Sequence, residues 1–263
     1  MADALAHVPA LTMGRIRVAR LDRAATANLM VELALGRRES AAPPAYLTSA
    51  NGQVLSMAAR DPAVMRMFTT ADLVSADGQP MVLMSRWLTK APLPERVATT
   101  DLFHDVARRA VQTGLTFYML GASPTENAAA VANVRRLYPD LRIVGAHHGY
   151  FGPEEERALV DAIAQLRPDF LWVALGVPRE QAFVVRNWPS LRGVGVVKTS
   201  GGLFNFLSGT RSRAPDWMQR AGLEWLYRTA LEPRRLLWRY ATTNVHALHI
   251  LLTQTKETSR QAS

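Results

Sequence analysis

An aspartate that directly follows a predicted buried strand is the best candidate in this chain for acid–base chemistry. Leu73, Val74 and Ser75 are typical of a strand end, because branched apolar side chains suit a covered, pleated surface. Asp77 comes next, and Gly78 permits a sharp turn. Open α/β sheets bind ligands at this edge, where a carboxylate could remove a proton from an attacking hydroxyl group. Alternatively, Asp77 could cap the helix predicted over 79–88.

Four other predicted strands run directly into loops that contain glycine. The loops are Leu120-Gly121-Ala122, His147-His148-Gly149-Tyr150, Leu175-Gly176-Val177-Pro178 and Lys198-Thr199-Ser200-Gly201-Gly202. In a doubly wound sheet such loops share one edge, and glycine lets backbone amides approach a phosphate closely. Together the four loops predict a ligand cleft.

Several common nucleotide, hydrolase and metal fingerprints are absent from the sequence. It contains no G-x-G-x-x-G, no Walker A loop and no G-x-S-x-G. It also lacks the D-x-D pair with which many sugar transferases hold a divalent ion. His147 and His148 are adjacent, so in a strand they would point to opposite faces and could not share a metal. We therefore expect no metal and no cofactor, with arginines, helix N-termini and loop amides stabilising a leaving diphosphate.

Short apolar runs alternate with helical patterns along most of the chain. This alternation predicts a Rossmann-like α/β fold, with a mostly parallel sheet covered by helices on both faces. The expected strands are 45–49, 72–75, 115–120, 141–145, 169–175 and 193–198, with a weaker one at 15–19. A capping box at Ser123 and Glu126 predicts a helix that ends at Leu137, and Pro153 begins another.

The character of the chain changes after Ser208, beyond which no strand is expected. We predict a catalytic core over 1–208 and a helical appendage over 209–263 that is rich in arginine and tryptophan. One face of its last helix carries Arg235, Arg239, Thr242, His246 and His249, and apolar residues fall on or near the other. Such a helix could lie on an anionic membrane, or it could pack on the core with a solvated basic face.

Composition limits the classes of protein that fit. The chain has 263 residues, enough for one large domain or a core with an appendage, and a net charge of +9 that favours phosphate-bearing partners. Such partners include nucleic acid, anionic lipid and nucleotide-diphosphate substrates. The absence of cysteine excludes disulfides, zinc-thiolate sites and a cysteine nucleophile. No signal peptide and no bilayer-spanning run is recognisable, which predicts a cytoplasmic protein, soluble or on a membrane surface.

A series of ordered motifs covers the chain from about Tyr46 to Tyr240. They are Thr48-Ser49-Ala50-Asn51, Ala76-Asp77-Gly78, Arg96-Val97 with Asp101-Leu102, Leu120-Gly121, the segment from Val144 to Phe151, Gly176-Val177-Pro178-Arg179-Glu180-Gln181, Arg213-Ala214-Pro215, the segment from Gly222 to Arg228, and Glu232-Pro233-Arg234-Arg235. Their joint order and spacing resemble those of the WecG/TagA/CpsF glycosyltransferases, family 26 in the carbohydrate-enzyme classification.

The resemblance implies inverting, metal-independent transfer of a sugar from a UDP-sugar to a saccharide on polyprenyl diphosphate. Such transfer serves cell-surface polysaccharide synthesis at the inner face of the cytoplasmic membrane, where the C-terminal helices would dock. It also implies that Asp77 is the catalytic base, and that the C-terminal arginines close over the site. The implied substrate-binding residues are Thr48, Ser49, Asn51, Arg96, Asp101, Gly121, Gly176, Pro178, Glu180, Gln181, Arg213, Arg228 and Arg235. A homo-oligomer is a further expectation.

Three segments depart from the family pattern. The usual Pro-x-Gln-Glu is Pro178-Arg179-Glu180-Gln181, the frequent Phe-Asp-Phe is Phe204-Asn205-Phe206, and the arginine motif at 96–99 lacks its glycine. These departures leave open which of Glu180 and Gln181 contacts the sugar donor. They also leave open which sugar is transferred and which acceptor receives it. Two alternatives remain: a basic α/β protein that binds nucleic acid, for which no recognition motif is present, and a glycosyltransferase with a soluble acceptor.

Overall fold

A six-stranded parallel sheet with the strand order β4-β3-β8-β7-β5-β6 is the main sheet of the fold. The computed structural model describes residues 5–258 apart from 216, 219, 220, 222 and 232. The strands are β3 (Ala45–Ala50), β4 (Leu73–Ala76), β5 (Thr116–Gly121), β6 (Arg142–His147), β7 (Phe170–Ala174) and β8 (Val196–Thr199). All six strands expected in the sheet are present within a few residues, which confirms the predicted α/β fold.

The chain divides into two compact units. Within the described residues, the first comprises 24–48 and 99–212, and the second comprises 5–23, 49–98 and 213–258. Both units take segments from distant parts of the sequence. The division proposed from the sequence, into a core over 1–208 and an appendage over 209–263, stays a prediction.

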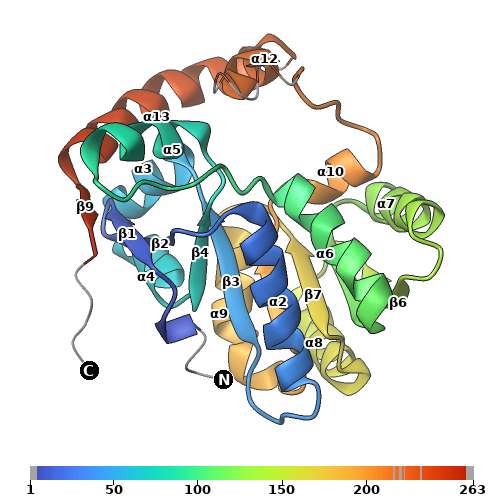
Figure 1. Ribbon diagram of the computed structural model, residues 1–263. Helices are drawn as coiled ribbons and strands as arrows, with labels where there is room; N and C mark the ends of the chain where they lie inside the picture. Colours follow the sequence, from blue (N-terminus) through green and yellow to red (C-terminus); the bar gives the residue numbers. More distant parts are fainter. Residues whose placement is uncertain (1–4, 216, 219–220, 222, 232, 259–263) are drawn as a thin grey trace. The chain divides into compact units, whose positions relative to one another are not determined.

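Helices cover both faces of the sheet in the first unit. They are α2 (Arg23–Arg37), α6 (Thr99–Thr113), α7 (Pro124–Leu137), α8 (Pro153–Leu166), α9 (Arg179–Asn187) and α10 (Leu203–Leu207), with a 3₁₀ turn, η1 (Trp188–Ser190). Figure 1 shows α2 and α6 in front of the sheet and α9 behind it. Arg109 of α6 donates to Asn28 of α2 at 2.7 Å, and Arg186 of α9 donates to Glu156 of α8 at 2.9 Å. These bonds join neighbouring helices on each face.

The core of the first unit is formed by strands that are buried along their whole length. Every residue of β5, β7 and β8 is buried, as expected for parallel strands covered on both sides. An aromatic cluster fills the space under α6, where the ring of Phe103 lies 5.7 Å from Phe117 and 4.9 Å from Trp172. This packing holds α6 against β5 and β7.

The second unit combines helices with a small antiparallel sheet. Its helices are α3 (Gly52–Arg60), α4 (Pro62–Thr69), α5 (Gln79–Leu88), α12 (Glu224–Leu231) and α13 (Pro233–Thr253). The sheet has the order β2-β1-β9, with β1 (Ala10–Met13), β2 (Ile16–Ala19) and β9 (Thr255–Glu257). The expectation of no strand after Ser208 is therefore wrong. The Thr-Lys-Glu sequence of β9 has no apolar run, and pairing with β1 makes it a strand.

Helix α13 packs against α3 and also exposes apolar side chains. Ala247, Ile250 and Leu251 are buried, and His246 Nδ1 lies 2.9 Å from Ser56 Oγ. Val245, Leu248 and Leu252 are exposed at 72%, 47% and 52%. Residues spaced by three and four share one face of a helix, so these three form a stripe. The residues expected on the apolar face of this helix therefore differ in burial: some pack against the protein, and others are exposed to solvent. The side chains of Arg235, Arg239 and Thr242 lie outside the described part of the helix.

Candidate active site

Asp77 lies immediately after β4 and is held by an arginine. Its backbone N–H donates to Ala50 O at 2.8 Å, which ties it to the end of β3. Its Oδ1 accepts from Arg96 Nη2 at 3.1 Å and from Nε at 3.3 Å. The side chains are 22% and 19% exposed, so the ion pair is partly covered and open to solvent. The N-cap of α5 is Gly78, so the alternative in which Asp77 occupies that position is wrong.

Asn51 packs against the turn that follows Asp77. A Cβ atom on Gly78 would lie 3.2 Å from both Cα and Cβ of Asn51, so glycine allows this close approach. Asn51 Oδ1 accepts from Val54 N at 3.1 Å and caps α3. The predicted substrate-binding residue Asn51 therefore also has a structural role, and it lies beside the Asp77 turn.

A buried polar network lies within the first unit. Thr48 Oγ1 accepts from Thr199 Oγ1 at 2.7 Å and from Gln181 Nε2 at 3.3 Å. All three residues are buried, with Thr48 at 0% and Gln181 at 1% exposure. Gln181 Oε1 is buried without a hydrogen-bond partner in the part of the chain that the structure describes. Buried amide oxygens are rarely left unpaired, so this atom is suited to a donor from a ligand or from water.

Glu180 holds the loop that follows β8. Its two carboxylate oxygens accept from Gly201 N at 3.1 and 2.8 Å, and its side chain is buried. Burial raises the pKa of Glu180 to about 7, although the Gly201 amide and the charge of Lys198 oppose this effect. Lys198 is also buried, and its Nζ donates to Thr199 O at 3.0 Å. Lys198 was not among the residues predicted from the sequence to belong to the site. It could have been found, because a lysine within an otherwise apolar predicted strand indicates a buried charge.

The glycine loops of the first unit meet at the carboxyl ends of the strands. Ala122 N donates to Ala174 O at 3.0 Å, and Gly149 N donates to Ala122 O at 2.8 Å. A Cβ atom on Gly121 would lie 2.2 Å from Ala174 O, so only glycine fits there. Gly176 has a φ of +79°, which also favours glycine. These contacts bring the loops after β5, β6 and β7 together, as the sequence predicted.

The remaining predicted residues are placed as follows. Ser49 is part of β3 and is partly buried, Pro178 is the N-cap of α9, and Asp101 lies in the first turn of α6. Arg213 is partly buried in the second unit. Arg228 belongs to α12 and Arg235 to α13, and their side chains lie outside what the structure describes.

The departure at Asn205 has a local explanation. Asn205 Nδ2 donates to Glu126 Oε1 at 2.5 Å, while Glu126 completes the capping box with Ser123. The Ser123 hydroxyl, together with the Asn205 amide, keeps the pKa of Glu126 below its ordinary value, against the opposing effect of burial. An aspartate at 205 would place a second carboxylate beside Glu126. Asparagine therefore supplies the donor that this site requires.

The expectation that the side chains of His147 and His148 point to opposite faces is wrong. Strand β6 ends at His147, so strand alternation no longer directs the next side chain. The two ring centroids are 4.3 Å apart, and one ligand atom each from His147, His148 and Glu155 lies within 4.8 Å of the others.

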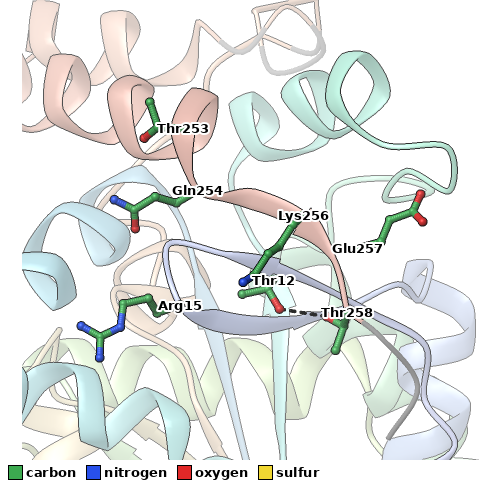
Figure 2. Close-up of a pocket in the computed structure, with 7 residues that line it drawn as sticks. All are labelled: Thr12, Arg15, Thr253, Gln254, Lys256, Glu257 and Thr258. Atoms are coloured by element: carbon green, nitrogen blue, oxygen red, sulfur yellow. Dashed lines mark hydrogen bonds between the residues drawn. The ribbon is translucent and has the colours of Figure 1, made fainter.

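Figure 2 shows a pocket of about 550 Å³ beside the small antiparallel sheet. It is lined by Thr12, Arg15, Thr253, Gln254, Lys256, Glu257 and Thr258. No residue predicted from the sequence to bind substrate lines this pocket, so it is distinct from the Asp77 site.

The parallel sheet and the glycine loops at its carboxyl edge define an α/β fold of the kind that typically binds ligands where parallel strands end. Residues 11–261 match the glycosyl transferase WecG/TagA/CpsF family, and the chain belongs to that family. The chain is therefore a glycosyltransferase, as the motifs implied.

Two relatives carry the same name, N-acetylglucosaminyldiphosphoundecaprenol N-acetyl-beta-D-mannosaminyltransferase. The protein from Bacillus spizizenii is 32% identical over 198 residues, which cover 74% of this chain and 74% of the relative. The protein from Bacillus subtilis is 32% identical over 197 residues, which cover 74% and 73%.

Proposed function

We propose that this glycosyltransferase transfers a sugar from a UDP-sugar to a saccharide carried on polyprenyl diphosphate, with inversion and without a catalytic metal. The relatives are named for transfer to a diphosphoundecaprenol-linked sugar, which supports an acceptor of that chemical class. Family motifs support the UDP-sugar donor. The observation that carries the proposal is the Asp77 carboxylate, which follows β4, pairs with Arg96 and is open to solvent.

The proposed reaction is a single in-line displacement. Asp77 accepts the proton of an acceptor hydroxyl as that oxygen forms a bond to the anomeric carbon. The bond from that carbon to the UDP oxygen breaks, and its electron pair leaves with the diphosphate. General-base assistance of this kind is typically worth about 10²–10⁴-fold in rate. Arg96 fixes the direction of the carboxylate through two donors on one rigid guanidinium.

The leaving diphosphate requires donors that act most strongly when negative charge develops on it. Backbone amides of the glycine loops and the family arginines Arg213, Arg228 and Arg235 are proposed for this role. Glu180 supports it indirectly, because it holds the Gly201 amide.

The membrane is proposed as the place of reaction, at its inner face. A polyprenyl chain is costly to extract from a bilayer, so the enzyme must approach the surface. The exposed stripe of Val245, Leu248 and Leu252, together with a net charge of +9, suits an anionic surface. No helix within the described residues is both long enough and apolar enough to cross a membrane.

The direct test is transfer with a panel of UDP-sugars and a synthetic polyprenyl-diphosphate saccharide. We expect one UDP-sugar to give an elongated lipid-linked product of inverted configuration, without added metal. Transfer to water-soluble analogues at the same efficiency would contradict the lipid-linked acceptor. No transfer or hydrolysis with any UDP-sugar would contradict the donor.

A further inference from the structure

The histidine and glutamate cluster at the end of β6 has the composition of a metal site. We propose that His147, His148 and Glu155 bind a divalent transition metal, with zinc as the best match. His147 ends β6, His148 follows it, and Glu155 lies in the first turn of α8. Their ligand atoms all lie within 4.8 Å of one another. The site goes beyond the proposed sugar transfer, none of whose steps passes through it.

The hydrogen bonds of His147 prepare its ring for a metal. Its Nδ1 lies 2.8 Å from His148 O. A carbonyl only accepts, so Nδ1 carries the proton and Nε2 of the neutral ring carries a lone pair. Histidine ligands commonly donate their other ring N–H to a backbone carbonyl in this way, which fixes the tautomer.

The second ring nitrogen of His147 faces a carboxylate. Nε2 lies 3.4 Å from Glu155 Oε1. Two electron-rich atoms this close repel each other, and a cation between them, either a proton or a metal ion, removes the repulsion. A charge-assisted N–H···O bond is shorter, about 2.7–2.9 Å. Two ligands of a tetrahedral zinc ion with bonds of about 2.0–2.1 Å are separated by about 3.3–3.4 Å. The observed 3.4 Å falls in this range, so the two atoms can bind one ion without moving apart or together.

The second imidazole lies beside the first. The ring centroids of His147 and His148 are 4.3 Å apart, and His148 Nδ1 accepts from Tyr150 N at 3.3 Å. That bond is long, and a metal bond at this atom would replace it. The Glu155 side chain is 51% exposed, so it can rotate to close the set around an ion.

The backbone that carries the histidines is held in place. Asn127 Nδ2 donates to His147 O at 3.0 Å, and Gly149 N donates to Ala122 O at 2.8 Å. A Cβ atom on Gly149 would lie 2.6 Å from Leu175 Cδ2, so the loop packs closely. A ligand set on a fixed backbone loses less conformational entropy when the metal binds.

The donor atoms decide which ions fit. Two imidazole nitrogens and one carboxylate oxygen favour Zn²⁺, Co²⁺ or Ni²⁺ over Mg²⁺ and Ca²⁺, which prefer oxygen ligands. Three protein ligands leave a position for water or another group. A bound ion would tie the loop after β6 to the start of α8.

The test is titration of the chelator-treated full chain with Zn²⁺ and with Co²⁺, followed by calorimetry and by the visible absorption of Co²⁺. We expect one ion to bind per chain, and the bound Co²⁺ to show the absorption spectrum of a four-coordinate ion. Equimolar Mg²⁺ should not compete for the site. Glu155→Gln and His147→Ala should each weaken Zn²⁺ binding at least about tenfold. His249→Ala removes an exposed histidine of α13 and should leave the affinity unchanged.

Thermal unfolding supplies a second readout. Zn²⁺ should raise the Tm of the wild type and of His249→Ala, and should do so much less for Glu155→Gln. Glu155 is largely exposed, so this variant is expected to fold, which far-UV circular dichroism checks. Equal Zn²⁺ affinity in wild type and Glu155→Gln, or no stoichiometric binding by the wild type, would overturn the proposal.

Discussion

Arg96 donates two hydrogen bonds to Oδ1 of Asp77, from Nη2 at 3.1 Å and from Nε at 3.3 Å. Both donors belong to one planar group, so they fix the orientation of the carboxylate as well as its charge. The two residues are separated by 19 positions in the sequence and meet after β4. This arrangement allows the base and its positioning residue to be tested separately.

Asp77→Asn should lower kcat by about 10²–10⁴-fold, because the amide cannot accept the proton of the acceptor hydroxyl. The side chains are nearly isosteric, so the fold and the affinity for UDP should change little. Steady-state transfer assays and UDP-dependent thermal shifts measure the two effects. Near-full activity in the Asp77→Asn variant would refute the assignment of Asp77 as the base.

Arg96→Lys should lower kcat about 10–100-fold, because lysine keeps the charge but loses the two-donor geometry. If Arg96 only positions Asp77, the KM for the UDP-sugar should change less than kcat. Arg86→Lys is a matched control, since Arg86 is exposed in the last turn of α5. Equal losses in both variants would show that the effect is not specific to the Asp77 pair.

Glu180 should make stability depend on pH. Burial raises its pKa from 4.5 to about 7, a difference worth about 3 kcal/mol. Its contribution is fully present below the unfolded pKa and is lost as pH rises through about 7. From pH 5 to pH 8, the wild type should therefore lose most of this ~3 kcal/mol of unfolding free energy relative to Glu180→Gln.

Urea unfolding of both proteins at pH 5 and pH 8 measures this difference. Glu154→Gln, which alters an exposed glutamate of α8, should follow the wild type at both values. Parallel pH dependence in wild type and Glu180→Gln would mean that the Glu180 carboxyl does not titrate in this range.

The sequence predicted the features that depend on local pattern. The six sheet strands carry apolar runs, and the capping box at Ser123 and Glu126 is local in sequence and present in the structure. Strand β9 could not be predicted, since its three polar residues become a strand only by pairing with distant β1. The proximity of His147, His148 and Glu155 was not predicted, because strand alternation was extended one residue beyond the end of β6.

Asn205→Asp should destabilise the first unit by about 1–3 kcal/mol at neutral pH. The change replaces the Asn205 donor with a carboxylate facing Glu126, so a hydrogen bond is lost and two like charges meet. Asn205→Ala loses the hydrogen bond alone and should be less damaging. The loss in Asn205→Asp should shrink at acidic pH, where one carboxyl is protonated. Denaturant unfolding at two pH values measures this, and a stability equal to that of Asn205→Ala at both would contradict the repulsion.

The exposed stripe of α13 should determine association with lipid. Changing Val245, Leu248 and Leu252 to serine removes apolar surface that would enter the interface, so binding to anionic liposomes should weaken roughly 10–100-fold. The matched control changes three exposed leucines of the first unit, Leu35, Leu137 and Leu166, to serine. Co-sedimentation measures binding, and transfer to liposome-embedded acceptor should fall in parallel only for the α13 variant. Because the buried face of α13 is untouched, circular dichroism should be unchanged. Equal binding by both triple variants would show that the stripe serves another purpose, and would leave the net charge as the main attraction to the surface.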